Sequence, residues 1–264
     1  MSTPRNLLGA KILVHWLEKS RAQRILHLLE ELSLPYEIKA YSRNPNGTAP
    51  DALKTIHPLG KSPLVSITPP PEAQKGPIVL AESGPIIEYL LSHSGEDAKA
   101  KALVPEQWKK GEEGELGGET EAWMRYRYWM HYAEGSLMSP VQVHLIMNAV
   151  ENAPVPFFLK PLVRFVPGRV RAEFLDQELK THFRFLESQL ETAPEGGPFF
   201  CGSRLTVADI QMSIPVLAGL NLSIVPRKEY PQLDAFSTAL QKTEGYQRAV
   251  RKIEELEGKP FVAI

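Results

Sequence analysis

The chain has 264 residues, of which 43% are hydrophobic and 23% charged, and these ordinary globular values argue against disorder. The formal net charge of −1 gives no bulk attraction to nucleic acid, and no run of eighteen apolar residues is present to span a bilayer. The single cysteine, Cys201, excludes an internal disulfide, a paired-cysteine redox motif and a cysteine zinc cluster. A reducing cytosol is then the default compartment, so we expect a cytoplasmic protein. Residues 1–6 carry no long apolar run, so we expect no secretory signal.

The first predicted unit is a strand, a helix and a second strand. Residues 11–15 form a short apolar run that is typical of a buried strand. From Ala22 to Leu32 the apolar residues follow helical spacing, and Pro35 ends this helix. Residues 36–41 then alternate as a half-buried strand does. We expect a right-handed crossover between parallel strands.

Two further strands and a helix complete this region. Residues 64–67 and 78–81 predict strands, and the Pro-rich loop between them is too short for a crossover helix. We therefore expect this pair to be antiparallel. Ser83 can cap a helix that follows the last strand. The pattern predicts an α/β domain, βαβ followed by ββα, over residues 1–95.

Beyond residue 95 the pattern becomes helical. Residues 105–120 are rich in Gly, Glu and Lys, which is typical of a linker or a surface excursion, and we expect a linker over residues 96–120. Residues 121–264 predict an all-helical domain, with helices over residues 121–133, 136–150, 169–191, 206–217 and 231–256. Thr206 and Asp209 resemble a capping box, which is a folding device. Cys201 is expected to be a buried, unreactive thiol.

Residues 154–170 mix apolar side chains with Lys160, Arg164 and Arg169. Such a mixture leaves association with a membrane surface open, but four prolines oppose one long amphipathic helix. We therefore expect a packed, irregular hydrophobic segment here, with membrane association as the second interpretation.

Three stretches lie where a predicted strand or loop meets a helix start or a tight turn. They are HWLEKSR at residues 15–21, HPLGKSPL at 57–64 and LAESGP at 80–85. Helix starts expose unpaired backbone N–H groups and favour anions. In this order the stretches resemble the glutathione-binding motifs of the cytosolic glutathione transferases. The first helix (residues 20–32) is similar to that of the fungal and bacterial branch, and TVADI at 206–210 is typical of the second domain of the family.

The resemblance implies a thioredoxin-like N-terminal domain followed by an all-α C-terminal domain that contributes the electrophile pocket. It implies glutathione as co-substrate and a homodimer in which the first domain of one subunit packs on the helical domain of the other. We expect no nucleic-acid partner and no metal, because the seven histidines show no metal-ligand spacing and no nucleotide-binding loop is present.

Ser20 is the residue to which the resemblance assigns catalysis. In serine-type transferases a serine at this junction, four residues before an arginine (here Arg24), stabilises the glutathione thiolate. Lowering a thiol pKa from about 8.5 to about 6.5 takes roughly 2.7 kcal/mol, which one hydroxyl donor and a helix N-terminus can supply. Ser20 and Gln23 also fit a capping box, so a capping role is the alternative and both roles can coexist. Glu18 and Lys19 are rival residues in the same turn.

Lys61, Ser62 and Pro63 match the turn that holds the middle of glutathione in the family. The resemblance implies a cis bond before Pro63, backbone contacts from Ser62 to the cysteinyl part, and Lys61 against the glycyl carboxylate. A solvated lysine is the alternative for Lys61, and His57 is either an assisting or a structural residue.

Glu82 and Ser83 match the acidic–hydroxyl pair that holds the γ-glutamyl end. Glu82 can accept from the α-ammonium group, while Ser83 at the helix start holds the α-carboxylate. An exposed carboxylate and a simple helix cap are the alternatives for these two residues.

The electrophile pocket is expected where the helical domain faces the thiol. Its candidate residues are Trp16, Leu17, Tyr128, Tyr132, Leu137 and Met138. Arg21 is a further candidate substrate contact. Aromatic residues at helical spacing more often form a core, so core packing is the alternative for the two tyrosines.

These residues predict a transferase that conjugates glutathione to hydrophobic electrophiles, with reduction of organic hydroperoxides as an open second activity. Two alternatives stay open. One is a non-catalytic glutathione- or ligand-binding protein of the same fold. The other is a dedicated enzyme that forms a carbon–sulfur bond in specialised metabolism.

Overall fold

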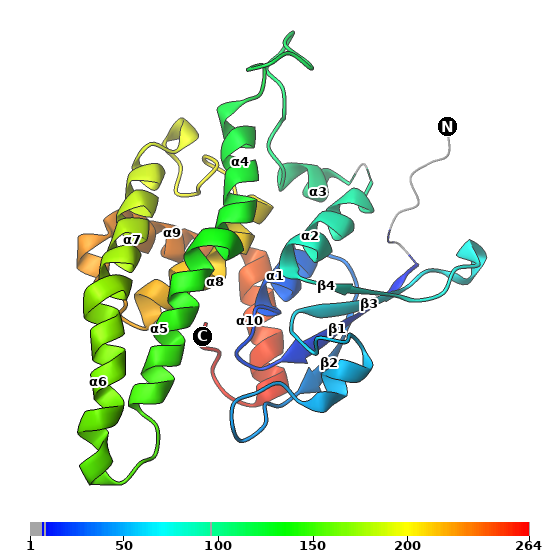
Figure 1. Cartoon of the computed structure of the whole chain (residues 1–264). Helices are drawn as coiled ribbons and strands as arrows, with labels where there is room; N and C mark the ends of the chain where they lie inside the picture. The colour runs from blue at the N-terminus through cyan, green and yellow to red at the C-terminus, as the bar shows by residue number, and fades with distance from the viewer. Residues whose placement is uncertain (1–6, 8, 96, 264) are drawn as a thin grey trace.

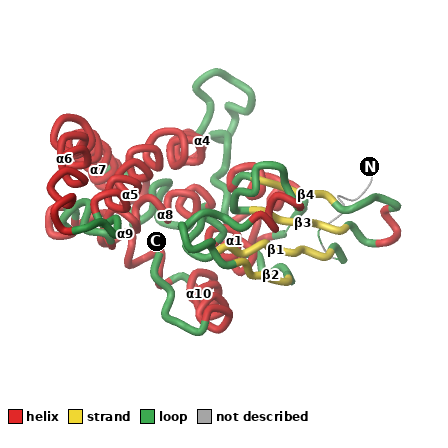
Figure 2. The backbone as a smooth tube through the Cα atoms, turned by 60° about the horizontal axis from the view of Figure 1, so that its bottom comes forward, coloured by secondary structure: helices red, strands yellow, loops and turns green. Residues whose placement is uncertain are grey.

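A four-stranded mixed sheet is the framework of the first part of the chain (Figures 1 and 2). The structure is a computed structural model that describes residues 7, 9–95 and 97–263; residues 1–6, over which we predict no secretory signal, lie outside the described residues. The strands lie in the order β2-β1-β3-β4, with bounds β1 Lys11–Leu17, β2 Glu37–Tyr41, β3 Leu64–Thr68 and β4 Ile78–Ala81. Strand β1 is parallel to β2, and β3 is antiparallel to β1 and β4, which confirms both expected pairings.

Helix α1 (Gln23–Glu31) begins later than expected and without the predicted capping box. Ala22 is its N-cap residue, and the Ser20 hydroxyl accepts the N–H of Ala22 at 3.2 Å, before the first helical turn. The Gln23 side chain is fully buried and has no hydrogen-bond partner in the part of the chain that the structure describes. The capping-box interpretation of Ser20 and Gln23 is therefore wrong, because tertiary burial draws Gln23 away from the helix start.

The second part of the molecule is helical and packs against the first (Figure 1). Its helices are α4 Glu121–Tyr132, α5 Met138–Glu151, α6 Lys160–Val170, α7 Asp176–Glu191, α8 Val207–Asn221, α9 Pro231–Lys242 and α10 Glu244–Glu257. Helices α2 (Ser83–Ser92) and α3 (Ala98–Ala102) precede them, and α3 lies within the predicted linker. Two π-helical turns, Ala133–Leu137 and Arg171–Leu175, continue α4 into α5 and α6 into α7. None of the helices in the described ranges is long and apolar enough to cross a membrane.

Helix α8 runs through the centre of the helical part. All its residues except Asn221 are buried. Its start carries the predicted capping box: the Asp209 carboxylate accepts the N–H of Thr206 at 2.8 Å and that of Phe200 at 2.9 Å. Burial raises the pKa of Asp209 to about 6, although these hydrogen bonds oppose the shift. Cys201 is buried as expected, and burial raises the pKa of its thiol.

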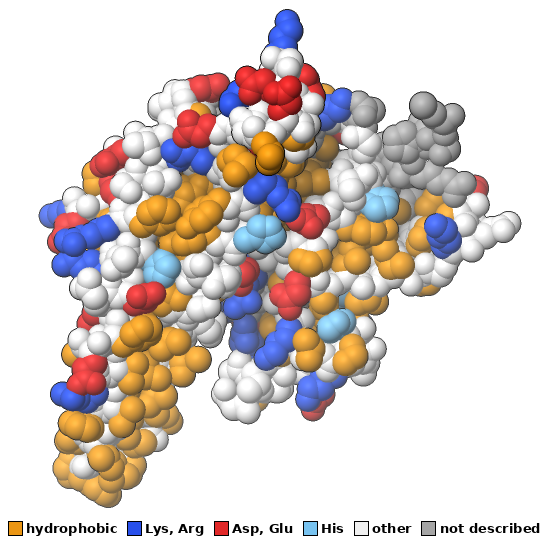
Figure 3. All heavy atoms as spheres, turned by 45° about the horizontal axis from the view of Figure 1, so that its top comes forward, with side chains coloured by type: hydrophobic (Ala, Val, Ile, Leu, Met, Phe, Trp, Pro, Cys, Tyr) orange, Lys and Arg blue, Asp and Glu red, His pale blue; other side chains and the backbone are white. Residues whose placement is uncertain are grey.

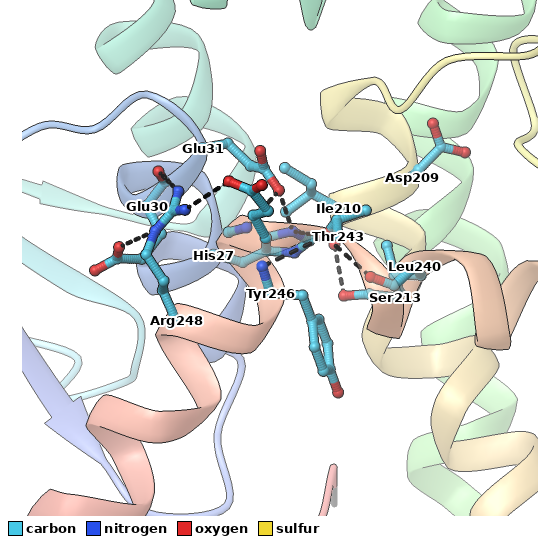
Figure 4. A network of polar contacts seen from close by, with 12 residues as sticks. His27, Glu30, Glu31, Asp209, Ile210, Ser213, Leu240, Thr243, Tyr246 and Arg248 are labelled. Carbon is cyan, nitrogen blue, oxygen red and sulfur yellow. Dashed lines mark hydrogen bonds and ion pairs between the residues drawn. The ribbon is translucent and has the colours of Figure 1, made fainter.

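Helix α10 attaches the end of the chain to α1 through buried polar contacts (Figure 4). The Nε2 atom of His27 lies 3.2 Å from both Glu31 and Thr243, and burial lowers the pKa of His27. Arg248 donates to the Glu30 carboxylate at 2.9 Å and to its carbonyl at 2.6 Å. The helix that carries the predicted catalytic turn is thus held from the opposite end of the sequence.

Residues 154–170 differ from the expected packed, irregular segment. A short 3-10 turn leads into helix α6, in which Pro161 occupies the first turn, where its missing N–H is not needed. Only Pro167 of α6 is buried, because α5 is the one helix that packs against its side among the described residues, and the other sides stay open. The expectation of packing is therefore wrong.

Candidate active site

A cavity of about 900 Å³ lies between the α/β part and helix α5. It brings together the turn after β1, the loop after β2, the turn before β3, the end of β4 and one face of α5. All three stretches singled out in the sequence contribute to its wall, so segments more than 60 residues apart in the chain converge on one site.

Ser20 lies in the cavity wall at the turn between β1 and α1. Its Oγ accepts the N–H of Ala22 and lies 3.0 Å from the Oγ of Ser62. A serine hydroxyl has one proton and two acceptor lone pairs. If Ser62 donates to Ser20, both lone pairs of Ser20 are occupied and its own proton is left to point into the cavity. The geometry therefore allows Ser20 to donate a hydrogen bond to an anion there.

Arg43 holds the Ser20 turn in place, and the sequence interpretation did not find it. Its guanidinium donates to the carbonyl of Glu18 at 3.1 Å, to that of Lys19 at 2.7 Å and to that of Gly47 at 3.0 Å. The Glu18 carboxylate in turn accepts the N–H of Arg43 at 3.2 Å. Lys19 has a positive φ of 49°, and fixing the carbonyls on both sides of that peptide sets the direction of the turn.

The two rival residues of this turn are placed differently. Glu18 is used by Arg43 and by Lys259 (3.3 Å), and it is absent from the cavity lining. The hydrogen bond from the Arg43 N–H and the contact with Lys259 lower the pKa of Glu18, so it remains a carboxylate, which repels a thiolate. Lys19 does line the cavity, so a positive charge stands beside Ser20.

Lys61, Ser62 and Pro63 form the neighbouring wall. The Ser62–Pro63 bond is cis, as the resemblance implies. The Lys61 side chain is exposed, and His57 lines the cavity on the same side. The His57 Nδ1 atom accepts the N–H of Leu59 at 3.4 Å, which shapes the loop before Lys61.

Glu82 lies at the end of β4, and Ser83 follows it as the first residue of α2. Glu82 is exposed, lines the cavity and has φ 69° and ψ 134°, a conformation that a non-glycine residue rarely adopts. Ser83 is only 3% exposed and is absent from the cavity lining. Its hydroxyl accepts from Gln211 at 3.0 Å and from Arg24 at 3.3 Å. Glu82, not Ser83, is the N-cap residue, so the predicted capping role of Ser83 is wrong.

An ion-pair cluster joins the first helix to the π-helical turn before α5. Glu134 in this turn pairs with Arg21 at 3.3 Å and with the fully buried Arg24. Burial lowers the pKa of Arg24, and the adjacent Glu134 carboxylate opposes that shift. Arg21 also lines the cavity. The cluster fixes where α5 begins relative to the Ser20 turn.

The helical wall contains some of the predicted electrophile-pocket residues and lacks others. Leu17 and Met138 line the cavity, together with three residues of α5 that the sequence interpretation missed, namely Gln142, Leu145 and Ala149. From Met138 these α5 residues recur at i, i+4, i+7 and i+11, a helical face that could have been recognised.

Trp16, Leu137, Tyr128 and Tyr132 do not line the cavity. Trp16 is 1% exposed and donates its indole N–H to Glu257 at 2.9 Å, while Leu137 is fully buried. Tyr132 is buried with its hydroxyl on His182, and Tyr128 stacks on its ring at 5.3 Å. These aromatic residues form part of the helical core and its surface, as the alternative interpretation held.

Within residues 7, 9–95 and 97–263, no group of three or more His, Cys, Asp or Glu residues is placed to hold a metal ion. The polar side chains of the cavity include the Ser20–Ser62 hydroxyl pair, several cations and the carboxylate of Glu82, together with Thr48, His57 and Gln142. Such a set suits an organic anion that also carries an ammonium group.

Comparisons with known proteins give the family. Residues 20–93 match the model of the glutathione S-transferase N-terminal domain, and residues 167–247 match that of the C-terminal domain. A crystal structure of a glutathione S-transferase from Actinobacillus pleuropneumoniae has a TM-score of 0.63 at 27% identity and covers 91% of this chain and 92% of its own. A glutathione transferase homologue from Lodderomyces elongisporus, with two glutathione molecules per subunit, has a TM-score of 0.64 at 18% identity, covering 90% and 97%.

The fold is thus a thioredoxin-like domain followed by an all-α domain. Glutathione S-transferase 1 of Saccharomyces cerevisiae is 31% identical to this chain over 245 residues, which are 93% of this chain and 96% of the yeast protein. With both domain models matched and nearly the whole of each sequence aligned, the chain belongs to the glutathione S-transferase family and is a glutathione transferase.

Proposed function

We propose that glutathione binds along the wall formed by the α/β part, with its thiol at Ser20, and that electrophiles bind against α5. The observation that carries this proposal is the Ser20–Ser62 hydroxyl pair at 3.0 Å, in which Ser20 also accepts the Ala22 N–H at 3.2 Å. With Ser62 as the donor in this pair, the Ser20 proton is left to donate to a thiolate. Glutathione is then a co-substrate, and the enzyme conjugates it to hydrophobic electrophiles.

The chemistry requires only stabilisation of an anion. The bound thiol loses its proton to solvent, and the thiolate accepts a hydrogen bond from Ser20. Lys19 and Arg21 add positive potential at the same wall. The sulfur lone pair then forms the C–S bond, and a leaving group departs with its electron pair. In an addition reaction the substrate carbon next to the new bond takes a proton from water.

The two ends of glutathione are assigned to different residues of this wall. Lys61 and Glu82 both line the cavity, and we assign Lys61 to the glycyl carboxylate and Glu82 to the α-ammonium group. Because the Ser83 hydroxyl is turned away from the cavity, we assign the γ-glutamyl carboxylate to the backbone N–H groups at the start of α2. Ser62 and Pro63 place backbone groups beside the cysteinyl part.

Steady-state turnover with glutathione tests the proposal, with chlorodinitrobenzene and cumene hydroperoxide as the second substrates. We expect conjugation well above the uncatalysed rate with the first, and the second measures whether hydroperoxides are also reduced. Glutathione binding by calorimetry without turnover of either substrate would instead indicate a ligand-binding protein of the same fold. A preference for one narrow electrophile class would indicate a dedicated C–S bond-forming enzyme.

The assembly is proposed to be a homodimer, as the resemblance implies. Static light scattering at micromolar concentration checks this directly. A mass of about one chain of 29.5 kDa would contradict it.

A further inference from the structure

The hairpin formed by α5 and α6 ends in a projection with an apolar surface (Figure 3). Hydrophobic side chains cover the end of this projection, away from the α/β part. The most exposed are Phe157 (83%), Leu162 (68%), Phe158 (66%) and Phe165 (64%). We call these four residues, together with Val166, the apolar tip. Large exposed apolar side chains gathered in one patch mark a site of interaction with a protein, a membrane or a ligand.

The apolar tip is not part of the packing that holds the helix. Phe158, Leu162 and Phe165 follow the i, i+4, i+7 spacing of one helical face. The one buried residue of α6, Pro167, lies on a different face. Removing the exposed side chains should therefore leave the hairpin intact.

Basic side chains accompany the apolar tip. Residues 151–171 contain four basic residues and one acidic residue, in a protein whose formal net charge is −1. Glu151 is used by Arg171 at 2.5 Å, and Glu173 is used by Arg169. Lys160 and Arg164 form no ion pair or hydrogen bond with any residue for which the structure gives a position.

Lys160 and Arg164 share a small polar cavity at the base of the hairpin loop. Its volume is about 450 Å³, and residues 151–155 complete its lining. These two cations, which pair with no described residue, are close in sequence to the protruding phenylalanines. This combination matches a lipid surface, which has anionic headgroups and an apolar layer below them.

We propose that the apolar tip docks on an anionic lipid bilayer, with its phenylalanines in the interfacial region and with Lys160 and Arg164 against lipid phosphates. The tip is a convex projection, which suits insertion between lipids better than capture of a peptide (Figures 1 and 3). Tip-to-tip pairing of two copies is disfavoured, because it brings the basic residues of both tips together. The docking is at the surface only, since none of the described helices can cross the membrane.

Flotation of the full-length protein with vesicles tests the proposal. We expect binding to vesicles of phosphatidylcholine with phosphatidylserine, weaker binding to phosphatidylcholine alone, and loss of binding as salt is raised. The triple variant Phe158→Ser, Leu162→Ser, Phe165→Ser should lose binding. Leu116→Ser is the control, because Leu116 is also an exposed apolar residue but lies outside the hairpin.

Reversing the charge of two basic residues separates the electrostatic contribution to vesicle binding from the apolar contribution. Lys160→Glu with Arg164→Glu should weaken binding to the anionic vesicles on the order of 10- to 100-fold, whereas Lys180→Glu on α7 should change it little. Melting temperature and chlorodinitrobenzene turnover should be unchanged in the triple variant, which distinguishes lost docking from misfolding and from failure of the active site. Absence of flotation by the unmodified protein, or equal flotation by the triple variant, would overturn the proposal. The proposal would also be overturned if the parent protein binds no vesicles and the triple variant differs from it in mass by light scattering. That result would indicate self-association through the tip.

Discussion

The two walls of the active-site cavity are built in different ways. On the α/β side, backbone geometry and hydrogen bonds set the chemistry: the Ser20 turn is held by Arg43, and Glu82 keeps a positive φ. On the other side, a single face of α5 presents Met138 and Leu145 with few polar groups. The first wall is specified by many contacts and the second by the side chains of one helix.

This difference predicts which substitutions should affect the use of glutathione and which should affect the choice of electrophile. Changes on the α/β wall should alter thiolate formation and glutathione binding, whatever the electrophile. Changes on α5 should alter electrophile selection and leave glutathione parameters unchanged. The Glu134 cluster with Arg21 and Arg24 keeps the two walls in register, and the following variants test this division.

Ser20→Ala should have the largest effect and should act on kcat. One preorganised donor at an anion contributes about 1.4–4 kcal/mol, so kcat should fall on the order of 10- to 1,000-fold with every electrophile. Glutathione affinity below the thiol pKa should barely change, because the carboxylate contacts remain. Ser62→Ala is the matched control and should reduce kcat less. A larger loss in Ser62→Ala than in Ser20→Ala would make Ser62 the thiolate donor.

Glu82→Ala should act on glutathione binding more than on chemistry. Loss of a charged hydrogen bond costs about 1.5–3 kcal/mol, so KM for glutathione should rise on the order of 10- to 100-fold with a smaller change in kcat. Glu88→Ala, another exposed carboxylate on α2 that does not line the cavity, should leave KM unchanged. Equal glutathione affinity of Glu82→Ala and the parent in calorimetry would remove Glu82 from the site.

Arg43→Ala should loosen the Ser20 turn, which Arg43 holds while also lining the cavity. Three carbonyl hydrogen bonds from a half-exposed guanidinium are lost, and we expect kcat/KM to fall about 5- to 30-fold. Arg43→Lys should rescue little, since one ammonium group cannot reproduce the planar fork. If the loss appears only in KM for glutathione, Arg43 is a binding residue rather than a positioning residue.

Leu145→Ala should change electrophile selection by a smaller factor. A pocket side chain that loses its methyl groups changes discrimination by about 1–2 kcal/mol, so KM for bulky apolar electrophiles should rise about 5- to 30-fold while KM for glutathione stays constant. Ile146→Ala is the control, because Ile146 is the next residue of α5 and does not line the cavity. An equal rise in KM for glutathione would contradict the division between the walls.

The free energy of unfolding should depend on pH through His27, a buried residue of helix α1. Burial lowers the pKa of His27 in the fold, so the unfolded chain binds the proton first as pH falls below about 6.5. His27 therefore contributes stability that is present above that pH and is lost on acidification, by at most about 1.4 kcal/mol per pH unit. Asp209 acts in the opposite direction. Burial raises its pKa to about 6 in the folded protein, so the folded state gains stability as this carboxyl group is protonated. Denaturant unfolding of His27→Gln and the parent from pH 7.5 to 5.5 should show a shallower loss in the variant; parallel curves would exclude His27.

Sequence patterns predicted the order of elements, the strand pairings and the three stretches of the polar wall, because these depend on local spacing and short loops. They failed where distant contacts decide. Ser83 has the sequence pattern of a helix cap, yet its hydroxyl accepts hydrogen bonds from Arg24 and Gln211 instead. Arg43 has no local signature, since its partners are carbonyls more than twenty residues earlier in the chain and one loop carbonyl.

Two proline-containing helices show the same limit. Both α8 and α6 are rich in apolar residues, and each continues through an internal proline, Pro215 in α8 and Pro167 in α6. Helix α8 is buried on all sides by α1, α4 and α9, whereas α6 has neighbours on one side only. Apolar composition alone does not say how many neighbours a helix has, and for that reason the exposed hairpin was expected to be packed.

The pKa of the thiol of bound glutathione tests the central claim most directly. Thiolate absorbance against pH measures it in the parent protein and in Ser20→Ala, with glutathione saturating. We expect the bound thiol to titrate well below the free value of about 8.5 in the parent protein, and at least about one unit higher in Ser20→Ala. The same pKa in both proteins, with only a lower melting temperature in the variant, would contradict the account and leave Ser20 as a residue that orders the turn.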